Sequence, residues 1–444
     1  MEIAPLQLAR IQFVASLGFH VLFLSLALAL AWLLLYFKWR ARRGDAGWTA
    51  AYRFWVRIFA LAFVLALASG VPVLFQLGSL WPVLMERVGN IAGPLVGFAV
   101  ATVFVLKSCF LGVMLFGQRR VSDTAHTLSV LMVALGMLLA VFWILALQSW
   151  THTPDGAVLV DGRYMVYDWW AVVFNPSMPW HFGMMVLGSA LAAAFLIMGV
   201  TAWQAANRPP ADGEKSAFKS ALLVATVAIL LQFAVGEGNG RVVARHQPAT
   251  AAAAAGYWHT GSPPRAVLFG LPDGDTQSNL LELAVPGGEA WLGRAADGTL
   301  QGLDTFSGMR PPVPAVFWLL RIMVGIGALM LLVSVVTLAW LGRRGLDPAL
   351  LPRWWLRVLS AMTFSGSVAV VAGWWLTELG REPYAVYGTV TMSEIAGPAT
   401  NGQLAWGMGG YGVLYALLLA AFVHMLFHAA RYGVVPVRKT GRKT

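Results

Sequence analysis

The chain has 444 residues, of which 58% are apolar and 11% are charged. Its apolar residues fall into runs longer than about 20 residues, so the composition excludes an ordinary soluble domain and indicates a polytopic membrane protein. The net charge of +11 is compatible with nucleic-acid binding, but the Lys and Arg residues lie in short segments between apolar runs instead of forming one patch. We therefore expect the lipid membrane, and no nucleic acid, as a partner.

The apolar runs, taken in chain order, are each long enough at 1.5 Å rise per residue to cross roughly 30 Å of hydrocarbon. In lipid only helices and closed barrels satisfy their own backbone groups, and these runs are too long and too uniformly apolar for barrel strands. The sequence therefore predicts an all-α fold, a bundle of nine transmembrane helices. The predicted helices span residues 12–37, 52–77, 91–117, 126–149, 179–203, 217–236, 314–341, 356–378 and 405–430.

The distribution of basic residues predicts the topology. Nineteen of the 31 Lys and Arg residues lie in alternate connecting segments and in the C-terminal segment. By the positive-inside rule these segments face the cytoplasm, which places the N-terminus in the periplasm and the C-terminus in the cytoplasm of a bacterial inner membrane. The basic segments are 38–53, 118–125, 204–219, 342–357 and 431–444.

We divide the chain into three regions. Residues 1–236 carry predicted helices 1 to 6, residues 237–313 form one long periplasmic loop, and residues 314–444 carry helices 7 to 9 and a cytoplasmic tail. An internal segment this long is uncommon without a function, which favours a docking or lid role. Cys109 is the single cysteine, so internal disulfides and a cysteine-bound iron–sulfur cluster are excluded.

Two ionisable residues near the outer ends of predicted helices are candidates for chemistry, because such groups cost on the order of 3 kcal/mol at a helix centre. His20 ends a polar stripe with Gln12 and Ser16 at a spacing of four residues; a hydrogen-bonded structural histidine is the competing interpretation. Glu378 lies at a helix C-terminus, where the macrodipole disfavours a carboxylate. Either a salt bridge to Arg381 or a cationic metal centre would compensate.

Further candidates enter the membrane from the same side. The segment "NPSMPWHFGMM" carries His181, Met184 and Met185, and the segment "LLRIMVGIG" carries Arg321 and Met323. Histidine, methionine and carboxylate are axial ligands of haem iron, and arginines neutralise propionates. Four helices that present these side chains at one depth predict a haem site near the periplasmic face.

Several motifs carry a resemblance to a known family. The chain resembles subunit I of cytochrome bd-type oxidases over its whole length, with the motifs in the same order and with the same nine spans. The resemblance implies a protein in which electrons pass from quinol at the long loop through a low-spin haem b to high-spin haems b and d, where oxygen is reduced. The motifs are "RIQFVASLGFHVLF", "FQLGSLW", "ALGMLLAVFWILALQSWTHTP", "NPSMPWHF", "LRIMV" and "GWWLTELGREPYAVYG".

The resemblance also implies ligands, cofactors and partners. His20 matches the histidine ligand of one high-spin haem, Glu378 the carboxylate ligand of the other, and Met323 the methionine ligand of the low-spin haem, with Arg321 beside it. We expect one or two haems b, with haem d as a further candidate. A subunit II-like membrane protein is the expected partner, and a small accessory subunit is a further candidate.

The low-spin site departs from the family pattern. The family histidine falls eight residues after the proline of the "NP" motif, and here that position is Met184, whereas His181 lies three residues earlier. Three alternatives are open: His181 is the ligand in a shifted geometry, Met184 and Met323 form a bis-methionine site, or the low-spin haem is missing. Arg381, in "GREP" where the family usually reads Gly-Arg-Gln-Pro, is retained as a cofactor-binding candidate.

The proton route and the quinol loop depart as well. Ala99 and Lys107 replace two glutamates of the family's cytoplasmic proton route, and Gln148 replaces a usual asparagine. Thr250 and Ala255 replace a lysine and a glutamate used with quinol. We therefore expect an oxidoreductase without the usual cytoplasmic proton channel and with a non-standard electron donor, such as a protein at the periplasmic face. The alternative is a non-catalytic or electron-transfer paralogue within a larger respiratory complex.

Overall fold

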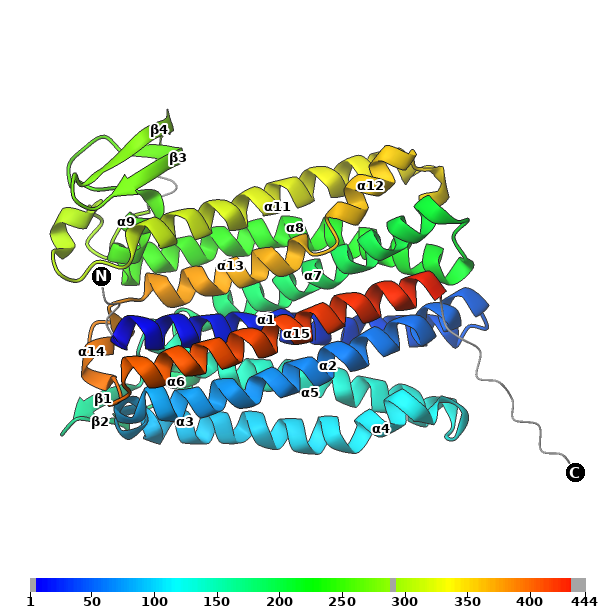
Figure 1. The fold of residues 1–444 in the computed structure, drawn as a ribbon, viewed down its shortest axis with the longest axis horizontal. Coiled ribbons are helices and arrows are strands. Elements are labelled where there is room, and N and C mark those ends of the chain that lie inside the picture. Colours follow the sequence, from blue (N-terminus) through cyan, green and yellow to red (C-terminus); the bar gives the residue numbers. More distant parts are fainter. Residues whose placement is uncertain (1–4, 288–292, 433–444) are drawn as a thin grey trace, which may run out of the picture.

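The structure, a computed structural model, describes residues 5–287 and 293–432, except for the side chains of residues 107 and 108. In this described part, nine helices are long and apolar enough to cross a membrane, and they run side by side in one bundle (Figure 1). The predicted all-α membrane fold is confirmed. The side chain of Lys107 and most of the basic C-terminal segment lie outside the described residues.

Two of the nine spans are interrupted and consist of more than one helical segment. The uninterrupted ones are α1 (Pro5–Ala41), α2 (Ala46–Leu80), α5 (Asp123–His152), α7 (Met178–Asn207), α8 (Asp212–His246), α11 (Val313–Leu341) and α15 (Asn401–Tyr432). The interrupted ones are α3 (Pro82–Thr102) continued by the π-helix η1 (Val103–Ser108) and α4 (Cys109–Phe116), and α12 (Arg353–Ala361) followed by α13 (Ser365–Gly380).

The core of the bundle forms around α1 and α7. The inner half of α1 is buried almost completely, because α2, α5, α7, α13 and α15 all pack against this helix. The middle of α7 is a continuous buried run from Leu191 to Val200. These two helices are apolar on all sides, as expected for helices that other helices surround. The remaining helices expose apolar side chains on the outside of the bundle.

Short elements collect at one end of the bundle, the end that carries the N-terminus (Figure 1). They include three antiparallel hairpins and the short helices α6 (Trp169–Val173), α9 (Pro248–Ala255) and α14 (Met392–Ile395). The hairpins are β1 (Ala157–Val160) with β2 (Arg163–Val166), β3 (Arg265–Asp273) with β4 (Ser278–Pro286), and β5 (Tyr384–Val386) with β6 (Val390–Thr391). The 3₁₀ turns are η2 (Gly117–Arg119) after α4, η3 (Leu303–Phe306) before α11, and η4 (Pro348–Leu350) between α11 and α12.

Two predicted boundaries differ from the structure. Helix α8 continues to His246, ten residues past the predicted end, so the segment between α8 and α11 is shorter than predicted and contains α9, the β3–β4 hairpin and η3. Residues 78–90, predicted as an outer loop, are helical apart from Trp81. The reason is Pro82, which occupies the first position of α3, where its fixed φ favours a helix and its missing N–H costs nothing.

The predicted eighth helix is interrupted between α12 and α13. At this break Thr363 packs against Gly199 of α7 so closely that a β-carbon on Gly199 would overlap the threonine side chain. The residues on either side of the break nevertheless lie on the same span, and α13 packs on α7, α11 and α1. The break therefore permits close contact with α7 and leaves Glu378 in the last turn of α13.

Candidate functional site

A chamber of about 520 Å³ lies between α1, α2, α3, α5 and α13. His20 of α1 and Glu378 of α13 both line this chamber, so the structure brings together the two residues that the sequence predicts as high-spin ligands. Helices α1 and α13 approach closely at Gly18, where a β-carbon would overlap the indole of Trp375, and that indole donates a hydrogen bond to the Val14 carbonyl (2.9 Å).

The imidazole of His20 is held by α2. Its Nδ1 lies 3.0 Å from the Ala66 carbonyl oxygen and 3.2 Å from the Ser69 hydroxyl. A carbonyl oxygen only accepts hydrogen bonds, so Nδ1 carries the proton and the lone pair resides on Nε2. An imidazole that donates its other N–H to a carbonyl is the usual arrangement of a histidine that binds a metal.

Glu378 is 8% exposed, and both of its carboxylate oxygens accept hydrogen bonds. Oε1 accepts from the Gln148 amide at 3.3 Å, and Oε2 accepts from Arg381 Nη2 at 2.8 Å. The salt bridge to Arg381 is thus one compensation for the unfavourable position of this carboxylate at a helix C-terminus. Arg381 also donates to the Thr151 hydroxyl, which fixes the guanidinium at the chamber wall.

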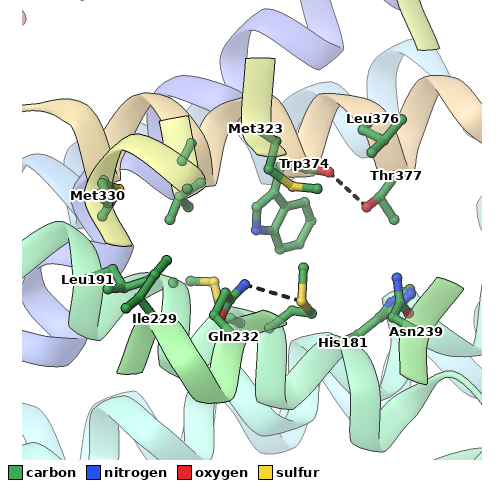
Figure 2. Close-up of a pocket in the computed structure, with 18 of the residues that line it drawn as sticks. His181, Leu191, Ile229, Gln232, Asn239, Met323, Met330, Trp374, Leu376 and Thr377 are labelled. Atoms are coloured by element: carbon green, nitrogen blue, oxygen red, sulfur yellow. Dashed lines mark hydrogen bonds between the residues drawn. The ribbon is translucent and has the colours of Figure 1, made fainter. Parts of the chain in front are cut away.

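A second, smaller pocket of about 130 Å³ lies between α7, α8, α11 and α13 (Figure 2). His181, Met184 and Met323 all line this pocket, so the structure also brings together the three candidates for the low-spin site. Figure 2 shows Met323 and Trp374 opposite Gln232 across the pocket. Its volume is below the range of about 300–1,000 Å³ that is typical of ligand pockets, whereas the chamber lies within it.

The candidate ligands of the small pocket have different hydrogen bonds. His181 donates from Nδ1 to the Gln148 amide oxygen (2.8 Å), so its lone pair resides on Nε2. The sulfur of Met184 accepts from the Gln232 amide at 3.2 Å. The sulfur of Met323 lies against Gly373 of α13, where a β-carbon would be 3.0 Å away. His181 therefore has the orientation of a ligand, whereas Met184 has a hydrogen-bonded sulfur.

The chamber and the small pocket share a wall. Gln148 and Leu145 of α5, Met185 of α7 and Trp374 of α13 line both cavities. Gln148 connects the two candidate sites directly, because its oxygen accepts from His181 and its nitrogen donates to Glu378. Gln148 stands where the resemblance leads us to expect an asparagine.

Arg321 does not line either cavity. Its guanidinium donates to the carbonyl oxygens of Ala254 (2.8 Å), Phe317 (2.7 Å) and Val267 (2.6 Å), and it lies over the Phe317 ring. The side chain thus ties α9 and the β3–β4 hairpin to the outer turns of α11. Met323, two residues later, points into the small pocket instead (Figure 2).

Three polar residues at the site were not singled out from the sequence. His152 is 2% exposed, its Nε2 lies 3.1 Å from the Gln148 amide nitrogen, and its ring packs edge-on against His181 with 5.2 Å between centroids. Arg10 and Glu382 form an ion pair (3.2 Å) at the outer wall of the chamber. The spacing of four residues between Gln148 and His152 at a helix end is a signal that could have revealed the first of them.

The polar residues of the chamber gather toward the end of the bundle at which α1 begins and α13 ends, and this distribution suits a large planar cofactor with an apolar body and acidic edge groups. His20 and Glu378 supply a nitrogen and a carboxylate donor, and Arg10 and Arg381 supply two cations that suit propionates. The donor set fits haem. The fold and the chamber thus indicate an integral membrane protein of the haem-binding class.

Comparisons with known proteins agree with this class. Residues 8–434 match the family described as "Cytochrome bd terminal oxidase subunit I". The chain is 29% identical to the cytochrome bd ubiquinol oxidase subunit 1 of Bacillus subtilis (97% of this chain, 94% of the relative) and 28% identical to the cytochrome bd-II ubiquinol oxidase subunit 1 of Escherichia coli (96% of each). It superposes on the bd oxidase of Geobacillus thermodenitrificans with a TM-score of 0.85 and 25% identity, covering 97% of this chain and 99% of that chain.

The chain belongs to the cytochrome bd terminal oxidase subunit I family. The resemblance carried by the sequence motifs is thereby confirmed. The class of the protein is confirmed as well, because members of this family are haem-binding oxidoreductases of the respiratory membrane.

Proposed function

We propose that the chain is the haem-binding subunit I-like component of a terminal oxidase that transfers electrons to oxygen at high-spin haem in the chamber. The observation that supports this most is the convergence of His20 and Glu378, from two helices, on one apolar cavity near the outer ends of both. In this proposal His20 Nε2 and Glu378 are iron ligands, and Arg10 and Arg381 neutralise propionates. When bound, haem supplies the site at which oxygen is reduced.

The small pocket holds a low-spin haem b in our proposal, with Met323 as one ligand and His181 as the other. His181 is favoured over Met184 because Gln148 fixes its tautomer, whereas the Met184 sulfur already accepts a hydrogen bond from Gln232. The shared wall through Trp374 and Gln148 then gives electrons a short route between the two sites. We expect one or two haems b in total, with haem d or a further haem b in the chamber.

The electron donor is expected to be non-standard. The named relatives are ubiquinol or menaquinol oxidases. In this chain Thr250, which replaces the family's lysine, is buried and donates a hydrogen bond to the Gly380 carbonyl (2.6 Å). Neither this threonine nor Ala255 supplies a charged contact for quinol. We therefore favour a redox protein that delivers electrons at the periplasmic face, where α9 and the β3–β4 hairpin lie.

The partner in the membrane is a subunit II-like protein, with a small accessory subunit as a further candidate. Relatives are named as subunit 1, which implies at least one further subunit. Apolar side chains exposed on the outside of α2, α3, α11 and α15 can contact such a subunit or lipid. In the proposed orientation the N-terminus is periplasmic and the C-terminus is cytoplasmic, as the basic segments predict.

Difference spectra with carbon monoxide test the proposed function. The purified complex, reduced with dithionite, is expected to show a carbon monoxide-sensitive high-spin band and to consume oxygen with an artificial donor. Six-coordinate haem alone would contradict the oxidase function and support the second candidate, an electron-transfer paralogue. That candidate is favoured by one observation: both oxygens of Glu378 already have hydrogen-bond partners.

A further inference from the structure

The polar residues of the chamber are unevenly distributed along its length. Its inner wall is apolar in the described part of the chain, because the residues that line it there are Leu24, Phe63, Val96, Ala99, Val100, Val103, Phe104, Met137, Ala140, Val141 and Ile144. None of these side chains can relay a proton. Ala99, which stands where the resemblance leads us to expect a glutamate of the proton route, belongs to this inner wall.

The outer wall contains every charged or titratable group that lines the chamber in the described part of the chain. These groups are Arg10 and His20 from α1, Glu378 from α13, and Arg381, Glu382 and Tyr384 from the segment after α13. No acidic or basic side chain of α2, α3, α5 or α7 lines it in that part. A proton that enters this cavity through the described side chains therefore enters from the outer end.

Glu382 occupies the position that suits such a transfer. The sequence reads "GREP" where the family usually reads Gly-Arg-Gln-Pro, so this chain carries an ionisable carboxyl in place of an amide. The Glu382 side chain is 12% exposed and that of its partner Arg10 is 19% exposed, while both also line the chamber. The carboxyl thus lines the chamber and stays partly accessible, beside Arg10, near the end of the bundle at which α1 begins.

We propose that Glu382 transfers protons from the outer solution into the chamber, to the oxygen that is reduced there. This inference rests on the proposed oxidase function. Reduction of one oxygen molecule takes four electrons, supplied by the donor at the outer face, and four protons, and yields two water molecules. In each transfer the Glu382 O–H bond breaks, its proton passes to reduced oxygen, and outer water reprotonates the carboxylate.

The electrostatics of Glu382 agree with this role. Burial raises the pKa of Glu382 above the ordinary carboxyl value, although the nearby Arg10 and Arg381 oppose this effect and Glu378 reinforces it. A carboxyl with a raised pKa is protonated over a wider pH range and releases its proton to a basic acceptor. Arg10 Nη1 donates to Oε2 at 3.2 Å and so holds the carboxyl at the chamber wall.

The competing explanation is that Glu382 serves only as a counterion for Arg10. Glu382→Gln separates the two explanations, because it restores the amide of the family pattern and keeps the size of the side chain. We expect the variant complex to retain its full haem content and to consume oxygen at least about tenfold more slowly with an artificial donor, as for loss of a positioned proton-transfer group. Glu382→Asp should recover part of the rate, and Glu394→Gln, a surface control, should match the wild type.

Two further measurements define the proton path. In proteoliposomes with the outer face exposed to the medium, an oxygen pulse should make the medium more alkaline in the wild type. The wild-type rate should also fall as the pH rises through the raised pKa of Glu382, and Glu382→Gln should lack this limb. A variant with normal haem content, a normal rate and an unchanged pH profile would overturn the inference in favour of the counterion.

Failure of the proposed function can be recognised separately. A wild-type complex that holds haem but consumes no oxygen would contradict the oxidase function itself. An infrared titration would then still decide whether Glu382 exchanges protons with the outer solution. The band to follow is the carboxyl band that is present in the wild type and absent in Glu382→Gln. A Glu382 that stays ionised throughout the titration would overturn the role as a proton carrier whatever the activity.

Discussion

The chamber and the small pocket share a wall but differ in volume and in how their candidate ligands are held. In the chamber, both predicted ligands are present and converge, and the cavity has the volume of a ligand site. In the small pocket, two candidate ligands compete, because His181 is oriented by Gln148 and the Met184 sulfur is hydrogen-bonded. The volume is also a quarter as large, about 130 Å³ against about 520 Å³. The difference makes the chamber the better-supported of the two candidate cofactor sites.

Replacement of Glu378 tests the chamber and has the largest expected effect. Glu378→Ala should remove one haem per complex and destabilise the protein by about 3 kcal/mol or more, because it leaves the guanidinium of Arg381 buried without its carboxylate. Pyridine-haemochrome stoichiometry measures the first effect and thermal unfolding the second. Glu378→Gln is a second variant for the case in which Glu378→Ala does not fold, because its side chain can still form the hydrogen bond to Gln148. Unchanged stoichiometry in both variants would refute the assignment of Glu378 as a ligand.

Paired variants in the small pocket test which residue is the low-spin ligand. His181→Ala should abolish the low-spin absorbance band, whereas Met184→Leu, which conserves side-chain volume, should leave it in place with at most a small shift. The reason is that the lone pair of His181 is available on Nε2, whereas the Met184 sulfur accepts a hydrogen bond. Reduced spectra at low temperature separate the two outcomes. Loss of the band in Met184→Leu alone would instead indicate the bis-methionine site.

Replacement of Gln148 in the shared wall should have a smaller effect, which should appear in both cavities. Gln148→Leu removes the hydrogen bonds to His181 and Glu378 together, and loss of such a supporting contact typically weakens metal binding by about 10- to 100-fold. The weakened binding is measured by haem retention during dilution and by the midpoint potentials of both haems. Gln148→Asn, which introduces the residue expected from the resemblance, is the matched control. A variant that perturbs only one site would show that Gln148 does not couple them.

A substitution outside both cavities sets the baseline. Glu394 pairs with Arg87 at 2.6 Å on the outer surface, and its removal should change the free energy of unfolding by less than about 1 kcal/mol. Hydrogen bonds from Thr391 and Arg87 lower the pKa of Glu394, so its contribution is present above the ordinary carboxyl pKa and is lost as the pH falls through the lowered value. The thermal stability of Glu394→Gln should lack this pH dependence. A large loss of stability in this variant at neutral pH would contradict the small contribution expected of the ion pair.

The class of fold and much of the candidate site follow from the amino-acid sequence alone. Nine apolar runs dictate nine helices because backbone groups in lipid must bond within their own helix. The basic segments predict which ends face the cytoplasm, and the motifs around His20, Met323 and Glu378 predict the candidate ligands. The errors lie at helix ends, as at the end of α8 and around Pro82. At these places polar residues continue the helix beyond the hydrocarbon layer, so the apolar run no longer shows where the helix ends.

How these helices meet depends on tertiary packing. The sequence contains Gln148 and Glu382 as two isolated departures from a pattern, and their meaning depends on distant neighbours: Glu378 lies 230 residues from Gln148, and Arg10 lies 372 residues from Glu382. Packing between helices also turns Arg321 toward the outer segment. The same packing makes the inner wall of the chamber apolar. Periodicity fixes which face of a helix is polar, but the contact partner of that face is set by the three-dimensional arrangement of the bundle.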